Sequence, residues 1–330
     1  MSLDLKAYIA ENPKLKYIFF GGKGGVGKTV MAGTAALWFA RQGKRTLLAS
    51  TNPVHSLSSL LGMNVFGKPT QVAPNLDAYE IDTRDTIEKS KVEIAEKIRW
   101  FLKFADIPTK ADDFVETATM NPAFEESAMF ENMINLMFED KYEVYVFDTA
   151  PTANARRLLG MSKVYGLWVN KMLESRKEAQ AMRLSLSFRN HKEEKDPLLD
   201  YLLSFQERMN HAQKLLTDRE KTAFFFVTLP EALPIAVIRR FIGWFNEFGI
   251  PVGGVIVNGV IQTSQVTEDS SEFVKNRVEM QRNYLEQIDE FFPDVRGRVP
   301  LFEREVRGIE MLDRVAAALF GESRVDSKSA

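Results

Sequence analysis

Short, continuously apolar runs recur along the 330-residue chain, and longer helical patterns separate most of them. A strand that is covered on both faces must be apolar at every position, whereas a strand with one solvated face alternates. The runs of this kind are Tyr17–Phe20, Thr46–Ser50, Val144–Asp148, Phe224–Thr228 and Gly253–Asn258, and a weaker run at Ala78–Ile81 predicts an edge strand. The chain therefore predicts an α/β fold with a doubly wound, mostly parallel sheet.

Two of the gaps between these runs are much longer than a crossover connection needs. We therefore predict one domain over 1–330 with an inserted α-helical subdomain at about 85–140 and 160–220. Within the first insertion, Met129, Met133 and Met137 recur at i, i+4 and i+8 and form one apolar face of a helix. Such a face usually packs into a core, but methionine also suits adaptable binding surfaces, so both interpretations stay open.

The segment Gly22–Thr29 reads GKGGVGKT and fits the P-loop pattern, directly between a predicted strand and a predicted helix. Glycines let backbone N–H groups turn toward phosphate oxygens, and the helix N-terminus adds a partial positive charge. This pattern predicts ATP binding with Mg²⁺, in which Lys28 reaches the β- and γ-phosphates and the Thr29 hydroxyl binds the metal. Asp148 ends the run Val144–Asp148, where P-loop folds place an acidic residue that faces the Mg²⁺ shell through water. The alternative, that Asp148 only caps a helix, is the less favoured interpretation, and the P-loop disfavours it further.

Composition narrows the range of partners. The chain has 43 lysines and arginines against 45 acidic residues, a net charge of -2, so no nucleic-acid partner is expected. With no cysteine, the chain has no disulfide, thiolate metal ligand or cysteine nucleophile. No apolar run approaches the roughly 20 residues that cross a bilayer, and the N-terminus lacks a signal pattern. We expect a cytoplasmic protein that is not itself transmembrane.

Lysines at both position 23 and position 28 make the loop resemble the deviant P-loop of the signature-lysine ATPases. Other stretches also resemble motifs of that class. They are Ser50–Leu57 (STNPVHSL) for switch I, Asp148–Thr152 (DTAPT) for switch II, Pro230–Pro234 and Val255–Val260 for nucleotide-contacting loops, and Val299–Leu312 for the loop beside adenine. From about residue 15 to 320, the order and spacing of these stretches resemble those of the motifs in one family. It contains the arsenical pump-driving ATPases and the ATPases that target tail-anchored membrane proteins.

The resemblance implies a homodimer in which two nucleotide sites face each other and Lys23 of each copy reaches into the partner's site. There its charge would offset the negative charge that develops on the phosphoryl oxygens. Glu231 would touch the nucleotide, and the Asn258 amide would recognise adenine. Taken alone, Glu231 would be a solvated loop acid and Asn258 a turn residue. The implied ATP-binding set also includes Gly22, Lys23, Gly24, Gly25, Val26, Gly27, Lys28, Thr29, Val30, Pro300 and Leu301.

The chain departs from the family's pattern at several positions. Asn52 stands where the family has its catalytic aspartate, and an amide can hold a water molecule but cannot take its proton. This predicts ATP binding with slow hydrolysis, whether Asn52 reflects natural divergence or a substitution that traps the ATP state. The family's paired zinc cysteines are also absent, with Ser271 and Val274 at about their places, so no zinc is expected.

Three functions follow from this reasoning. The favoured one is a homodimeric targeting ATPase that shelters a hydrophobic tail anchor in a groove formed by the methionine-rich helices. The second is the catalytic subunit of an arsenite or antimonite efflux pump docked on a membrane partner, although soft arsenite prefers thiolates that this chain lacks. The third is a nucleotide-gated binding module with little ATPase activity, which Asn52 favours.

Overall fold

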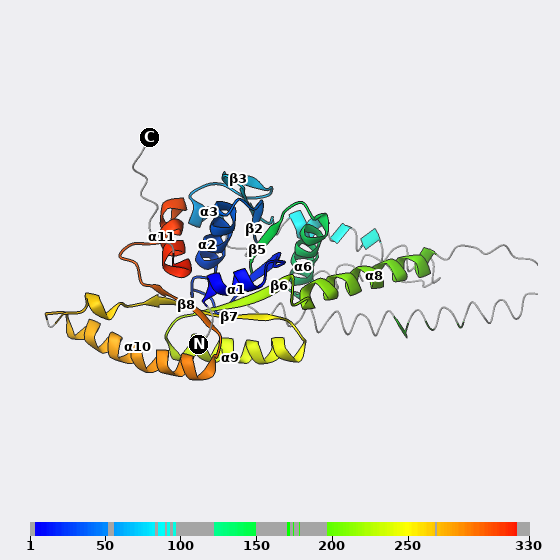
Figure 1. The fold of residues 1–330 in the computed structure, drawn as a ribbon. Coiled ribbons are helices and arrows are strands. Elements are labelled where there is room, and N and C mark those ends of the chain that lie inside the picture. The colour runs from blue at the N-terminus through cyan, green and yellow to red at the C-terminus, as the bar shows by residue number, and fades with distance from the viewer. Residues whose placement is uncertain are drawn as a thin grey trace, which may run out of the picture. The chain divides into compact units, whose positions relative to one another are not determined.

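The computed structural model describes residues 4–51, 56–82, 85–89, 91–92, 95–96, 122–149, 170–171, 174, 178, 197–267 and 269–321. Within these residues, one eight-stranded sheet has the order β3-β4-β2-β5-β1-β6-β7-β8 (Figure 1). Its strands are β1 (Tyr17–Gly21), β2 (Thr46–Ser50), β3 (Thr70–Ala73), β4 (Leu76–Glu80), β5 (Val144–Asp148), β6 (Thr222–Thr228), β7 (Val252–Val260) and β8 (Val295–Pro300). All neighbouring strands pair in parallel except β3 and β4, which are antiparallel. The predicted doubly wound, mostly parallel sheet is confirmed.

Helices lie on both sides of this sheet (Figure 1). One side carries α1 (Leu5–Glu11), α2 (Lys28–Arg41), α3 (Ser56–Leu61) and α11 (Gly308–Phe320), and the other carries α9 (Ala232–Glu247) and α10 (Glu272–Phe291). The remaining described helices are α6 (Pro122–Glu139), α8 (Pro197–Thr217) and the 3₁₀ turn η1 (Thr263–Gln265). The β1–α2 connection thus passes from the centre of the sheet onto one of its faces.

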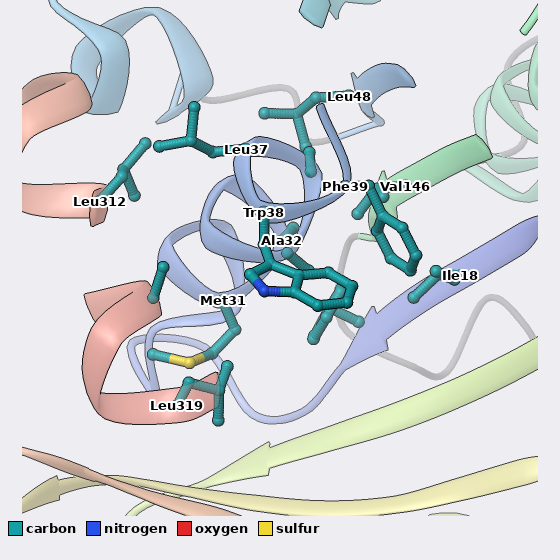
Figure 2. Close-up of a cluster of buried hydrophobic side chains, with 14 of the residues drawn as sticks. Ile18, Met31, Ala32, Leu37, Trp38, Phe39, Leu48, Val146, Leu312 and Leu319 are labelled. Carbon is teal, nitrogen blue, oxygen red and sulfur yellow. The ribbon is translucent and has the colours of Figure 1, made fainter. Parts of the chain in front are cut away.

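Residues of the central strands point alternately to two separate apolar layers. On the α2 side, Ile18, Leu48 and Val146 pack with residues of α2 and α11 (Figure 2). On the opposite side, the Phe19 ring stacks on Phe224, with ring centroids 4.3 Å apart. It also stacks on Phe147 of β5, at 4.8 Å. Burial on both faces explains why these strands are apolar at every position.

The expectation that Ala78–Ile81 forms an edge strand was wrong, because β4 lies between β2 and β3. The edge is β3, a four-residue strand that sequence analysis missed because it is short and has no fully apolar run. At the other edge, sequence analysis also missed β8, in which two arginines interrupt the apolar pattern. Arg296 is nevertheless buried, since its Nε donates to the carbonyl oxygen of Gly253, while Arg298 pairs with Asp289.

The chain divides into two compact units. The first comprises Met1–Thr86, Met129–Thr152 and Asp218–Ala330, and the second comprises Ile87–Ala128 and Ala153–Thr217. The second unit spans much of the predicted insertions at 85–140 and 160–220, whereas the end of α6 with its methionines groups with the sheet. Among the helices that the structure describes, none is both long enough and apolar enough to cross a membrane.

Candidate nucleotide site

The loop between β1 and α2 is shaped by glycines in conformations that L side chains rarely adopt. Gly22 has φ 148°, Gly25 has φ 82° and Gly27 has φ 96°. A Cβ atom on Gly22 would lie 2.4 Å from the Val227 carbonyl oxygen, so only glycine lets the loop pass so close to β6. The loop therefore leads directly into the N-terminus of α2, as the predicted phosphate loop requires.

Lys28 is the first residue of α2, and its side chain is buried. Its Nζ atom donates a hydrogen bond to the carbonyl oxygen of Lys23, 3.1 Å away. Burial lowers the pKa of Lys28, while the negative charge of Asp148 opposes that shift. A bound phosphate would stabilise the charged ammonium in the same way as Asp148 does, so the position of Lys28 suits an anion.

Asp148 ends β5 and is almost fully buried beside the first turn of α2. Its Oδ2 atom accepts hydrogen bonds from Thr29 Oγ1 at 2.8 Å and from Ser50 Oγ at 3.2 Å. Its Oδ1 atom is buried and has no hydrogen-bond partner. Burial raises the pKa of Asp148 from 3.8 to about 6, although the two hydroxyls and Lys28 favour its charged form.

This donor set fits the metal that accompanies ATP. The Thr29 hydroxyl and the Asp148 carboxylate are hard oxygen donors, which Mg²⁺ prefers. The unpartnered Oδ1 atom offers a further acceptor for a metal-bound water. A cation here would also relieve the cost of burying the Asp148 charge. When bound, Mg²⁺ would offset negative charge on the phosphates, with Thr29 holding it and Asp148 facing its shell.

Glu80 is a second buried acid near this site, at the end of β4. It accepts hydrogen bonds from the Leu57 N–H at 3.0 Å and from Ser58 Oγ at 2.6 Å, so it fixes the start of α3. Its charge contributes to the raised pKa of Asp148. Sequence analysis placed Ser50 in the switch I stretch without a hydrogen-bonding role and assigned no role to Glu80. The available signal for Glu80 was an acidic residue within the predicted strand Ala78–Ile81.

The end of β7 contacts the P-loop through Asn258. Asn258 Nδ2 donates to the carbonyl oxygen of Val26, at 2.9 Å. The exposed Leu301, next to Pro300 at the end of β8, donates its N–H to the Val260 carbonyl oxygen, also at 2.9 Å. The structure thus brings Asn258 onto the P-loop and joins the Pro300–Leu301 segment to the end of β7.

Glu231 precedes α9, and its carboxylate pairs with Arg277 of α10 at 3.2 Å. Val30 lies half-buried in the first turn of α2, and Lys23 is half-buried in the loop. Asn52 lies outside the described residues. The roles in ATP binding that we assigned to these residues stay predictions.

Comparison with known proteins agrees with these motifs. The model of a family described as anion-transporting ATPase matches residues 15–321. An ATPase ASNA1 homolog of Paramecium tetraurelia is 31% identical, over 94% of this chain and 94% of its own length. The ATPase get3 of Pyrenophora tritici-repentis is 28% identical, over 94% of this chain and 93% of its own. A protein of Halobacterium salinarum named as an arsenical pump-driving ATPase is 30% identical over 96% of this chain but only 46% of its own length.

We expect the buried charge of Asp148 to destabilise the metal-free, nucleotide-free protein as pH rises. Between about pH 4 and pH 6 the folded state keeps a proton that the unfolded chain releases, since the folded pKa is the higher one. Stability contributed by protonated Asp148 is complete below pH 4 and is lost as pH rises through 6, by about 3 kcal/mol. Asp148→Asn should remove this loss. Unfolding free energies measured in chelator from pH 4 to 7 would contradict the expectation if the two proteins gave parallel curves.

Proposed function

Because this chain belongs to the anion-transporting ATPase family and is an ATPase, we propose that it acts as a cytoplasmic homodimer that shelters a hydrophobic membrane-protein segment. The observation that carries the proposal is the P-loop with two lysines, in which Lys28 contacts the Lys23 carbonyl oxygen and Thr29 contacts Asp148. Two copies would close around two molecules of ATP with Mg²⁺.

The two lysines would have different tasks. Lys28 is buried at the start of α2, so it would bind the β- and γ-phosphates of its own subunit's nucleotide. Lys23 lies earlier in the loop and is half-buried, and its side chain would extend into the site of the second copy. An ammonium group supplied across the interface would stabilise the charge that develops on the phosphoryl oxygens, and ATP would thereby hold the two copies together.

Hydrolysis would be slow because Asn52 can orient the attacking water without accepting its proton. Phosphoryl transfer depends mainly on positioning and charge stabilisation, so some turnover would remain. A long-lived ATP state suits a protein that must keep an apolar segment covered until it is delivered.

The hydrophobic segment would bind the methionine-rich region. Met129, Met133 and Met137 are buried in this structure, which agrees with their packing in a core. A role in segment binding therefore requires that closure of the dimer expose them. Methionine suits this change because its flexible side chain adapts to different apolar partners.

Service to a membrane pump is the second candidate. It is supported by the Halobacterium salinarum relative, whose name refers to an arsenical pump and of which this chain covers 46%. A relative of about twice the length could hold two such units in one chain, whereas this chain, with one P-loop, would need a second copy. The absence of cysteine argues against direct metalloid sensing.

Replacing Lys23 and Lys28 one at a time distinguishes the roles of the two lysines. We expect Lys23→Ala to bind ATP as a monomer, to lose dimerisation, and to lose at least about 100-fold of the turnover, as when one group that stabilises the developing charge is removed. Lys28→Ala should lose ATP binding itself. Analytical ultracentrifugation with ATP and Mg²⁺ measures dimerisation, and phosphate release measures turnover. Lys68→Ala, at an exposed position, is the control. A wild-type protein that stays monomeric with saturating ATP would refute the dimer.

Introducing a carboxylate at position 52 tests the slow-turnover prediction. Asn52→Asp should raise the rate of phosphate release by about 100-fold, because the aspartate can accept the proton of the attacking water. Its ATP affinity should change little. The prediction fails if the unmodified chain turns over as fast as Asn52→Asp in single-turnover assays.

Binding of a defined peptide tests the proposed cargo. We expect the ATP-loaded protein to retain a peptide of about 20 consecutive apolar residues, and to release it after hydrolysis. A peptide of equal length with four lysines spread through it is the matched control. Fluorescence anisotropy measures the affinity. Equal binding with and without ATP, together with stimulation of turnover by arsenite or antimonite, would instead favour the pump.

A further inference from the structure

Gln281 of α10 is a buried polar side chain outside the predicted nucleotide contacts, with 5% of its surface exposed. Its Oε1 atom accepts a hydrogen bond from the Ile261 N–H at 2.8 Å, and its Nε2 atom donates to the Ile261 carbonyl oxygen at 2.9 Å. One amide therefore satisfies both backbone polar groups of the residue that directly follows β7. It continues the hydrogen bonding of the sheet by one residue beyond the end of the strand.

The segment that Gln281 holds has an irregular backbone. Val257 pairs with Arg298 and Val260 pairs with Pro300, so Asn258 and Gly259 together lie opposite Val299 alone. Two residues facing one form a β-bulge, which changes the direction of side chains on the bulged strand.

Within this bulge, Gly259 has φ 69° and therefore adopts the left-handed conformation that favours glycine. The preceding residue, Asn258, directs its amide to the Val26 carbonyl oxygen of the P-loop. The bulge thus sets the direction in which Asn258 points.

Two contacts fix the bulge on its C-terminal side. The Leu301 N–H bonds to the Val260 carbonyl oxygen, and Gln281 bonds to both polar groups of Ile261. Without the Gln281 amide, these two partly buried backbone groups of Ile261 would lose their protein partner, and the end of β7 would be free to relax. Because an amide that recognises a base must be held within about 0.5 Å of its working position, such relaxation would reach Asn258.

We propose that Gln281 is a positioning residue for base recognition, which acts by holding the bulged end of β7 and thereby the Asn258 amide. The inference rests on the proposed function, in which Asn258 recognises adenine. Gln281 itself need not touch the nucleotide. Its replacement should therefore reduce the preference for ATP over GTP, whereas a loss of general stability would weaken the binding of both nucleotides alike.

Two substitutions test this inference. Gln281→Glu keeps the shape and the acceptor but removes the donor to the Ile261 carbonyl oxygen, and Gln281→Met removes both. We expect each to lower the ATP affinity by about tenfold and the GTP affinity by less than about threefold, as calorimetry would measure. Gln287→Glu, at an exposed position on the same helix, is the matched control and should leave both affinities unchanged.

Asn258→Ala completes the test, because Gln281 is expected to act through Asn258. It should reduce the ATP preference to a similar extent, and the double variant Asn258→Ala/Gln281→Glu should be no worse than either single variant. If Asn258→Ala lowers the preference but the Gln281 variants do not, or if they weaken both nucleotides equally, the inference is overturned and the proposed function stands. If Asn258→Ala leaves the preference unchanged, adenine recognition by Asn258 fails, and the inference fails with it.

Hydrogen exchange of the unmodified protein keeps the inference testable if the Gln281 variants do not fold. Saturating ATP should slow exchange of the Ile261 amide by at least about tenfold more than saturating GTP does, because only adenine would engage Asn258 and tighten the bulge. Equal protection by the two nucleotides would overturn the inference.

Discussion

The Thr29 and Ser50 hydroxyls donate to the same carboxylate oxygen of Asp148, and the geometry of the whole site depends on this shared acceptor. Thr29 belongs to α2, Ser50 ends β2 and Asp148 ends β5, so one side chain joins three elements that are far apart in the sequence. Because Asp148 is buried, its second oxygen cannot turn to solvent to find a partner. The protein therefore holds a carboxylate whose charge a metal ion would stabilise.

At two places around the site, a buried side chain binds backbone groups at the end of a helix or strand. Glu80 accepts the Leu57 N–H at the start of α3, and Gln281 bonds to both polar groups of Ile261 beyond the end of β7. Both side chains pair with backbone groups that the neighbouring helix or strand cannot satisfy. Segments next to a nucleotide site need this support because they lie where regular hydrogen bonding stops.

The central strands and the P-loop could be predicted from the sequence because each depends on local features. Burial on both faces made β1, β2, β5, β6 and β7 continuously apolar, and the glycine spacing marked the loop. The edge strands β3 and β8 could not be predicted in this way. Arg296 in β8 is buried with its Nε donating to the carbonyl oxygen of Gly253, which lies in β7 and 43 residues away in the sequence.

The site residues also divide into those that a local motif identifies and those that depend on contacts with distant parts of the chain. Motif spacing identified Lys28, Thr29 and Asp148, and the structure brings Thr29 and Asp148 into contact. Gln281 lies 20 residues from Ile261, and Glu80 lies 23 residues from Leu57. Nothing in a single sequence shows that an amide on an amphipathic helix will turn inward to a strand end. Such pairings become visible only when the sheet has placed the two segments side by side.

The two edges of the sheet constrain how this chain can meet another copy. β3 has only four residues and is flanked by Pro69 and Pro74, while β8 carries Arg298 and ends at Pro300. Short strands, prolines and charged side chains all prevent a second sheet from adding on by strand pairing. The proposed homodimer would then form through loops and helices rather than through a sheet shared by the two copies. Contacts of that kind would be able to form and break as a ligand binds and leaves.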